Sequence, residues 1–397
     1  MIALTVLVGV WGFACFVFTV AAINAVRKMV RRSSAEVANA KSWPALAILR
    51  PCEGLDAGLE ENLLSSLTAR YDGPREVFLL VPARSDPAWA IAERVVAQAA
   101  ARAPGVKVQL VETAIQTRAN RKVAQLLAAA PYGDAPVIVV ADSDIRFDER
   151  TLPSLIGVLE VHPRAGASSA PYMEVLKETA GDRASAALLS STPHAFYCLT
   201  ALAERSGGAH VLCGALIAIK RAVLDEVGGF ASLEPFLGED FELARRLHEN
   251  GYTIPTSPAP APVFDHGRTV SSVVRRFARW CTVTRQQRPH LFATYTLLLG
   301  CMPPILCGAA VALTLHAPYA PLAALIVTVA LAVRIALAAT LRRCYGLSAN
   351  PLRALFALLV GETVILLAAT LALGRPEVEW RGRRYHVGPG GLLSRIN

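Results

Sequence analysis

Charged residues are scarce in this chain of 397 residues. They make up 18% of it, whereas an ordinary soluble protein contains about 25%. Hydrophobic residues reach 53%, and the mean hydropathy is +0.40. An apolar content this high excludes an intrinsically disordered chain, and the shortage of charge indicates a membrane protein.

Cysteine is sparse as well. The eight Cys are scattered along the chain, and no two of them form a Cys-x-x-Cys pair. They are too few for a disulfide scaffold, and their spacing matches no zinc motif. We therefore expect buried free thiols, which is how isolated cysteines usually occur.

Acidic residues are outnumbered by basic ones, 31 against 40, so that the formal net charge is +9. The surplus lies beside apolar segments: in residues 27–32, in residues 268–290, and in the tail at Arg381, Arg383, Arg384 and Arg395. Basic residues at the ends of apolar segments anchor them on the cytoplasmic side of a membrane. This placement accounts for the charge, and no nucleic-acid partner is needed.

The first apolar segment is residues 1–26, which contain no charged side chain and are followed by the basic stretch 27–32. About 20 apolar residues are enough to span a bilayer. A cleavable signal peptide would begin with basic residues, and here none precedes the apolar run. We predict that residues 1–26 form an N-terminal transmembrane anchor whose C-terminal end faces the cytoplasm.

Residues 291–374 form a second apolar region, with two or three transmembrane segments. If the middle of the chain is cytoplasmic, three full spans would place the basic tail, residues 375–397, outside, against the usual distribution of positive charge. We therefore expect one segment to be re-entrant or interfacial, either at Pro303-Pro304 or at Glu362. Glu362 is also expected to pair with Arg334, because an unpaired charge at that depth is unfavourable.

The middle of the chain, residues 36–290, alternates short β-rich runs with helical stretches. The β-rich runs are 45–50, 76–81, 107–111 and 136–140, and the helical stretches between them are 58–70, 88–101 and 120–130. This alternation predicts an α/β domain with a mixed, largely parallel sheet. Ligands of such sheets bind beyond the carboxyl ends of the strands.

Acidic residues stand where two of these strands end. Asp142 and Asp144 follow the fourth run, and two carboxylates spaced in this way can hold a divalent cation and the ribose of a nucleotide. The alternative is a turn in which an Asp caps the next helix. Asp86, after the second run, either caps the following helix or contacts a nucleobase.

Two further positions allow a functional and a structural interpretation. Lys122 could pair with a diphosphate or be a surface lysine. Glu239 and Asp240 open the helical stretch 241–248. Acids at that place are favoured by the helix dipole, but Asp240 could also act as a general base.

Arg276, Arg279 and Trp280 lie in a helix predicted over 270–288, next to the second apolar region. The two Arg share one face of the helix and could bind a diphosphate, and Trp280 could stack on an acceptor. A basic interfacial helix would account for the same pattern.

The order of these motifs resembles the D, DxD, ED, (Q/R)xxRW series of family-2-like membrane glycosyltransferases, which have the GT-A fold. Several flanking segments look more closely like the ceramide glucosyltransferase family: Leu49-Arg-Pro-Cys-Glu-Gly54, Asn120-Arg-Lys122, Pro193-His194 and Val227-Gly-Gly-Phe230. The segment Val378-Glu-Trp-Arg-Gly-Arg-Arg-Tyr385 resembles one in related membrane transferases. The resemblance covers essentially the whole chain. It departs at Glu53, where a Lys or a neutral residue is expected, and Arg276 takes the R option of the last motif.

The resemblance implies that a hexose, glucose by analogy, is moved with inversion from a UDP-sugar to the primary hydroxyl of ceramide or a related lipid. It implies that Asp240 is the base, that Asp144 and Asp142 hold Mg²⁺ or Mn²⁺, and that Arg276 and Arg279 stabilise the leaving diphosphate. It places Trp280 at the acceptor and His194 near the active site, although a solvated or capping histidine is an equal alternative for the latter. The donor contacts it implies are Asp86, Lys122, Asp142 and Glu239.

The acceptor itself stays open. A lipid would reach the site through the apolar region 291–374, and a hopanoid or diacylglycerol could replace ceramide. A polysaccharide synthase would need more spans to enclose a polymer channel. An inactive nucleotide-sugar sensor and a transporter are further alternatives. The Ala- and Arg-rich composition suggests a bacterial inner membrane, with the catalytic domain on its cytoplasmic face.

Overall fold

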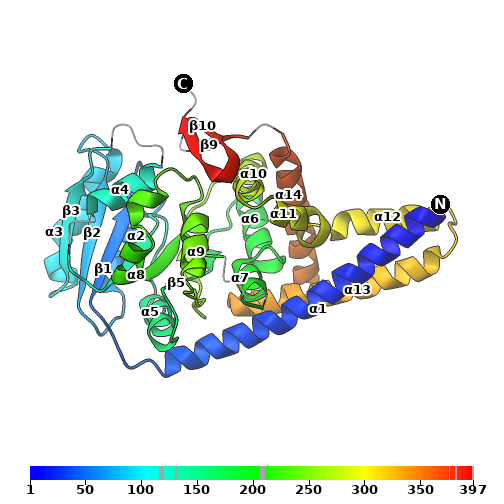
Figure 1. Ribbon diagram of the computed structural model, residues 1–397, viewed down its shortest axis with the longest axis horizontal. Helices are drawn as coiled ribbons and strands as arrows, with labels where there is room; N and C mark the ends of the chain where they lie inside the picture. Colours follow the sequence, from blue (N-terminus) through cyan, green and yellow to red (C-terminus); the bar gives the residue numbers. More distant parts are fainter. Residues whose placement is uncertain (116–119, 130–132, 206–210, 375, 381, 396–397) are drawn as a thin grey trace.

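The computed structural model describes residues 1–397 except 116–119, 130–132, 206–210, 375, 381 and 396–397. Arg381 of the predicted basic tail and Ala130 at the end of a predicted helix lie outside the described residues. An α/β domain forms one part of the molecule, and long apolar helices form the other (Figure 1).

The α/β domain is built on a six-stranded sheet in the order β3-β2-β1-β4-β7-β5. Its strands are β1 Leu46–Pro51, β2 Arg75–Val81, β3 Lys107–Glu112, β4 Val137–Ala141, β5 Ala167–Ser169 and β7 Leu216–Lys220. The pairs β1–β2, β1–β4 and β2–β3 are parallel, whereas β7 runs antiparallel to β4 and β5. The sheet is therefore mixed and largely parallel, as predicted, and the four predicted strands are all present.

Side chains of the central strands are buried on both faces of this sheet. In β1, Leu46 and Ile48 belong to one apolar cluster, and Ala47 and Leu49 belong to another. Successive side chains of a strand point to opposite faces, so a continuously apolar strand needs cover on both sides. Helices provide that cover.

Helices of the first layer include α2 Leu59–Thr68, α3 Pro87–Arg102, α5 Thr151–Val161 and α6 Ala180–Ser191. The opposite layer is formed by α4 Arg121–Ala129, α8 Arg221–Glu226, η1 Phe230–Leu233 and α9 Glu239–Glu249. A separate parallel pair is formed by β6 Tyr172–Glu174 and β8 Ala261–Val263, and Val263 of β8 makes a single bridge to Ile145 after β4. Helix α7 Phe196–Arg205 follows α6.

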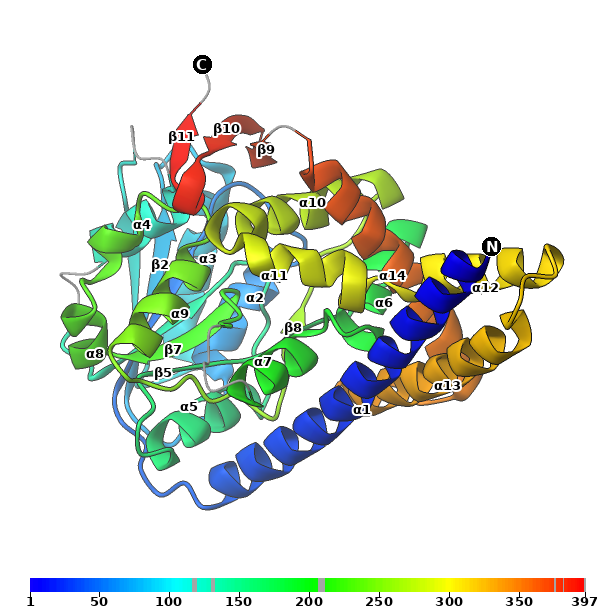
Figure 2. The ribbon, with the colours of Figure 1, turned by 45° about the vertical axis from the view of Figure 1, so that its right-hand side comes forward.

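Three described helices are long and apolar enough to cross a membrane: α1 Ile2–Ala38, α13 Ala320–Cys344 and α14 Pro351–Ala372. Helix α1 is longer than the predicted anchor of residues 1–26, because residues 27–38 contain no Pro or Gly that would end it. It lies beside α13 in both views, and the N-terminus is close to α12 Met302–Thr314 (Figures 1 and 2).

The chain enters this region through α10 Val270–Gln287, which is followed by α11 Pro289–Thr294 and the π-helical turn η2 Tyr295–Leu299. The stretch Pro289–Leu299 meets α12 at a bend of 49°, so the two form either a broken span or a re-entrant loop. The bend lies next to Pro303-Pro304, one of the two places where the sequence predicted such an interruption.

A buried ion pair holds this bend. Arg334 Nε of α13 lies 2.8 Å from Glu362 Oε1 of α14, and both side chains are fully buried, which confirms the predicted pairing. Arg334 also donates to the carbonyl oxygen of Leu298 and to Thr19 Oγ1 of α1. Glu362 Oε2 accepts from the backbone N–H of Met302 at 2.7 Å. Backbone groups freed by the bend are thereby satisfied, as the interior of a bilayer requires.

The described residues of 377–395, predicted only as part of a basic tail, contain a three-stranded antiparallel sheet in the order β11-β10-β9. Its strands are β9 Glu377–Trp380, β10 Arg383–Val387 and β11 Leu393–Arg395, with the short turn η3 Pro389–Gly391 between the last two. This C-terminal sheet lies beside α10 (Figure 2). Its apolar side chains form one cluster with Leu237 and Val283.

Candidate active site

A cavity of about 970 Å³ opens at the carboxyl ends of β1 and β4. Of the ten predicted site residues, all of which the structure describes, nine line it: Lys122, Asp142, Asp144, His194, Glu239, Asp240, Arg276, Arg279 and Trp280. Asp86 is the exception. The sheet topology therefore brings together residues that are more than 150 positions apart in the sequence, at the edge where ligands of such sheets bind.

Lys122 lies between the Asp142-Ser-Asp144 motif and the Glu239-Asp240 motif. Its Nζ lies 2.8 Å from Asp142 Oδ1 and 3.3 Å from Glu239 Oε1, and it donates to the carbonyl oxygen of Gly214 at 2.9 Å. Its side chain is only 16% exposed, so it is not an ordinary surface lysine. Burial alone would lower the pKa of Lys122, but Asp142 and Glu239 outweigh burial and raise it, so the side chain stays charged.

Asp144 stands at the end of β4 beside two other carboxylates, Asp142 and Asp56. Burial and the charges of these neighbours raise the pKa of Asp144 to about 7, although Arg276 acts in the opposite direction. Asp56 also contacts the hydroxyl of Ser143, between the two motif residues. The end of this strand thus concentrates negative charge.

Asp240 lies in the first turn of α9. Its carboxylate accepts hydrogen bonds from the backbone N–H groups of Gly214 at 3.1 Å and Phe241 at 2.8 Å. A side chain at Gly214 would not fit, because a Cβ there would lie 2.5 Å from Asp240 Oδ2. Burial and the neighbouring Glu239 raise the pKa of Asp240 to about 7, against the opposing effect of Lys122. A carboxyl group that titrates near neutrality is suited to general-base catalysis.

Asp86 has the capping role that the sequence allowed. It is the N-cap of α3, where its carboxylate accepts from the N–H of Ala88 at 2.9 Å, and Pro87 occupies the first helical position. The same oxygen accepts from the N–H of Gly54 at 2.9 Å and so ties the loop after β1 to this helix. A contact between Asp86 and a nucleobase stays a prediction.

Arg276 is held by residues that the sequence did not single out. Its guanidinium donates to Glu174 Oε1 at 2.8 Å and to the hydroxyl of Tyr172 at 2.9 Å. Burial would lower the pKa of Arg276, but Tyr172 and Glu174 raise it, so the positive charge is secure. Glu174, itself fully buried, also lies 3.1 Å from Arg268.

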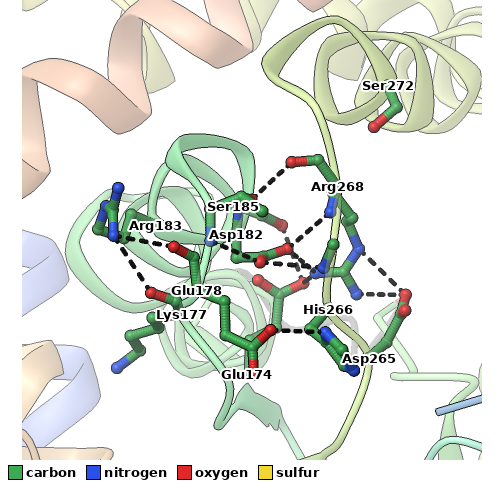
Figure 3. Close-up of polar contacts among 12 residues, drawn as sticks. Glu174, Lys177, Glu178, Asp182, Arg183, Ser185, Asp265, His266, Arg268 and Ser272 are labelled. Carbon is green, nitrogen blue, oxygen red and sulfur yellow. Dashed lines mark hydrogen bonds and ion pairs between the residues drawn. The ribbon is translucent and has the colours of Figure 1, made fainter.

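Arg268 in turn organises the loop before α10, as Figure 3 shows. It is paired with Asp265, and its backbone N–H donates to Asp182 of α6. The sequence signal for this network is Glu174, the one charged residue in the otherwise uncharged segment Ala170-Pro-Tyr-Met-Glu174.

Trp280 and His194 belong to an aromatic cluster that lines the cavity. Their rings are stacked, with centroids 6.3 Å apart, and Phe277 and Tyr295 are also packed against His194. Burial lowers the pKa of His194 to about 3, so the ring is neutral. This cluster joins the α/β domain to η2 and presents aromatic surface to the cavity.

Arg279, one turn after Arg276, points toward the C-terminal sheet. It donates to the carbonyl oxygen of Glu379 at 3.4 Å. The two arginines of the motif therefore have different partners, although both line the cavity. One is held by Glu174, and the other lies against β9.

The carboxylates fit a divalent cation that binds together with a ligand. Within the described part of the chain, no group of three or more His, Cys, Asp or Glu could by itself enclose a metal ion. Asp142 and Asp144 supply the hard oxygen atoms that Mg²⁺ and Mn²⁺ prefer, and the remaining positions would fall to phosphate oxygens and water. The surplus of negative charge at Asp144 is what a bound cation would relieve.

The sheet, the carboxylates at its strand ends and a cavity reaching apolar helices are the arrangement of a membrane glycosyltransferase with the GT-A fold. Residues 10–393 match the family described as glycosyl transferase family 21, and the chain belongs to this family.

The chain is 24% identical over 407 residues to ceramide glucosyltransferase 3 of Caenorhabditis elegans, covering 98% of this chain and 83% of that protein. It is also 24% identical over 258 residues to ceramide glucosyltransferase 1 of the same organism, covering 64% of this chain and 53% of that protein. Among solved structures, the mannosyltransferase PcManGT from Pyrobaculum calidifontis, in complex with GDP-Man and Mn²⁺, superposes with a TM-score of 0.45 at 19% identity, covering 92% of this chain and 99% of that one.

Proposed function

We propose that this glycosyltransferase moves a hexose, glucose in the first instance, from a UDP-sugar to the primary hydroxyl of ceramide or a related lipid, with inversion at the anomeric carbon. The acceptor oxygen attacks this carbon opposite the departing UDP. The new bond joins the acceptor oxygen to the sugar, and the bond to the diphosphate breaks. Family membership and the two ceramide glucosyltransferase relatives support this choice of reaction.

One observation carries the proposal: a single cavity is lined both by the carboxylates that such a reaction needs and by apolar side chains of the membrane region. Asp144 and Asp240 line it, and so do Phe18 of α1 and Leu291 and Leu299 at the start of the membrane region. A lipid could keep its chains among the apolar helices while its head group reaches Asp240. A soluble acceptor would need no such apolar wall.

The chain's own residues then have distinct roles. Asp240 takes the proton of the acceptor hydroxyl, and its pKa, raised to about 7, suits a general base near neutral pH. Arg276 and Arg279 stabilise the negative charge that grows on the leaving diphosphate. Lys122, Glu239 and Asp142 bind the donor. Mg²⁺ or Mn²⁺ at Asp142 and Asp144 would supply further charge stabilisation.

Release of UDP by the purified full-length protein tests the proposal. UDP-glucose, UDP-galactose, UDP-GlcNAc and UDP-glucuronate are each offered with Mn²⁺, with and without ceramide. We expect ceramide-dependent release from one donor. Asp240→Asn should reduce it by about 10²- to 10⁴-fold, the usual effect of losing a general base. Asp225→Asn, at an exposed site on α8, is the matched control and should leave the rate unchanged.

Other outcomes redirect or reject the proposal. Release that depends on a hopanoid or diacylglycerol instead of ceramide would keep the chemistry and change the acceptor. A soluble saccharide product of increasing length would identify a polysaccharide synthase. No release of UDP with any donor and acceptor would favour a nucleotide-sugar sensor.

A further inference from the structure

The C-terminal sheet meets the catalytic cavity. Trp380 of β9 and Tyr385 of β10 both line the cavity that contains Asp240 and Arg279. Their ring centroids are 6.3 Å apart, and Tyr385 is only 2% exposed. Two aromatic side chains from the last 20 residues of the chain therefore form part of the cavity wall.

This wall is fastened to the segment that leads into Asp240. The N–H of Leu237 donates to the carbonyl oxygen of Gly391 at 3.3 Å, and the N–H of Leu393 donates to that of Pro235 at 2.8 Å. Leu237 also belongs to the same apolar cluster as Tyr385. Only Gly238 separates residues 235–237 from Glu239-Asp240, so the C-terminal sheet is attached directly before the catalytic residues.

Helix α10 provides a second attachment. Gly391 has a φ of 84° and lies against Gln287, and a Cβ at Gly391 would be 2.5 Å from that side chain. Gln287 itself donates to the carbonyl oxygen of Gly238 at 3.5 Å. One side chain thus contacts both the C-terminal sheet and the residue that precedes α9. The position of Trp380 is consequently set by the two elements that carry Asp240 and Arg279.

The location of Trp380 within the cavity indicates which substrate it meets. The apolar end of the cavity, where a lipid would enter, is lined by Phe18, Leu291 and Leu299. Trp380 instead packs in the cluster of Leu237 and Val283, and the carbonyl oxygen of the preceding residue, Glu379, accepts from the guanidinium of Arg279. A ring that follows the residue contacted by Arg279, and that packs with the segment leading into Asp240, is suitably placed to meet the donor sugar.

We propose that Trp380, supported by Tyr385, is a binding residue for the hexose of the donor, and that the backbone of Glu379 positions Arg279. The flat apolar face of an indole ring covers the C–H face of a pyranose, and the contact excludes water from the anomeric carbon. This assignment rests on the proposed function, because it takes the donor to be a UDP-hexose.

Binding measured on the full-length protein in detergent tests the assignment without requiring turnover. The probes are UDP and UDP-glucose, each with Mn²⁺. Trp380→Ala should weaken UDP-glucose binding by about tenfold, equivalent to about 1.4 kcal/mol, and leave UDP binding within about twofold. Trp380→Phe, which keeps a flat ring, should recover most of the loss. His386→Ala, on the exposed face of the same sheet, is the control and should change neither affinity.

Kinetics and fluorescence separate contact from a structural role. Trp380→Ala should raise the KM for the donor and leave that for the lipid unchanged. UDP-glucose should change the tryptophan emission of the wild type and of Trp89→Phe, whose ring lies on α3 away from the cavity. The change should be reduced in Trp380→Phe. If Trp380→Ala does not fold, Trp380→Leu takes its place.

Two results would overturn the assignment. Equal loss of UDP and UDP-glucose affinity would show that the sheet only supports the fold. A change in the lipid KM alone would place Trp380 at the acceptor. A failure of the proposed function is distinguished by the wild type. It would then bind no UDP-sugar, or would bind it without transferring the sugar.

Discussion

Two groups of buried charges in this protein differ in how they are balanced. Among the apolar helices, Arg334 and Glu362 pair one to one, and both are fully buried. At the end of β4, Lys122 faces Asp142 and Glu239, with Asp240 nearby, and negative charge is in excess. The first arrangement is complete within the chain. The second is suited to a ligand that brings positive charge, because unbalanced carboxylates favour protonation or a bound cation.

The comparison also separates a structural role from a functional one. In the membrane region each polar atom of the pair satisfies a backbone group or another side chain at the bend after Leu299. In the active site, burial and neighbouring carboxylates disfavour the charged forms of Asp144 and Asp240. The pKa of each is thereby raised to about 7. Sites that maintain such unfavourable charge are commonly catalytic.

The largest expected effect is on the membrane pair. Arg334→Ala leaves Glu362 buried without its partner and should destabilise the protein by about 3–5 kcal/mol, whereas Arg334→Met combined with Glu362→Leu should restore most of that loss. Thermal unfolding in detergent measures both. A double variant as unstable as the single one would mean that the pair is needed for more than mutual neutralisation.

A smaller effect is expected at the contact between Gly214 and Asp240. The Cβ added by Gly214→Ala would lie 2.5 Å from Asp240 Oδ2, so the carboxylate must move. A displacement of about 1 Å at a catalytic group can reduce the rate by about 100-fold. The measurement is kcat at saturating donor and acceptor. Gly9→Ala controls for loss of a glycine elsewhere, because a Cβ at Gly9 would make only ordinary contacts, the nearest at 3.9 Å. An unchanged kcat would argue against Asp240 as the base.

The smallest effect concerns the stability of the active site. The raised pKa of Asp144 means that the folded state binds an extra proton between about pH 4, near its ordinary pKa of 3.8, and about pH 7. Its favourable contribution is fully present below this range and is lost as the pH rises through about 7. Without divalent cations, Asp144→Asn should therefore stabilise the protein at pH 8 by about 1 kcal/mol while reducing activity.

Thermal midpoints of the wild type and of Asp144→Asn at pH 5 and pH 8 test this expectation, with Asp225→Asn as the control. The difference between the variant and the wild type should grow with pH and shrink when Mn²⁺ and UDP are added to the wild type. A variant less stable than the wild type at pH 8 would show that Asp144 is balanced within the chain, as Glu362 is.

Much of the fold could be predicted because its signals are local. The strands around Leu46–Pro51 and Val137–Ala141 are short apolar runs bounded by turn residues, and the long spans contain almost no charge. The candidate site could be predicted because the topology of a parallel sheet brings strand ends to one edge.

Other features depend on contacts between distant segments. Glu174 is an ordinary Glu until β6 places it beside Arg268 and Arg276. The ring of Trp380 lines the cavity because Leu393 and Leu237 fasten β11 and η3 to the segment before α9. Such contacts leave no periodic pattern in the sequence.

The sequence by itself determined the class of fold, the membrane segments and the set of residues available for chemistry, because apolar periodicity, charge placement and motif order are properties of the chain alone. Only the tertiary structure decided that Asp86 caps a helix, that Lys122 is buried between two carboxylates and that the basic tail is a sheet beside the cavity. The physical reason is that burial and the sum of neighbouring charges set the state of a polar side chain, and both depend on segments far apart along the chain.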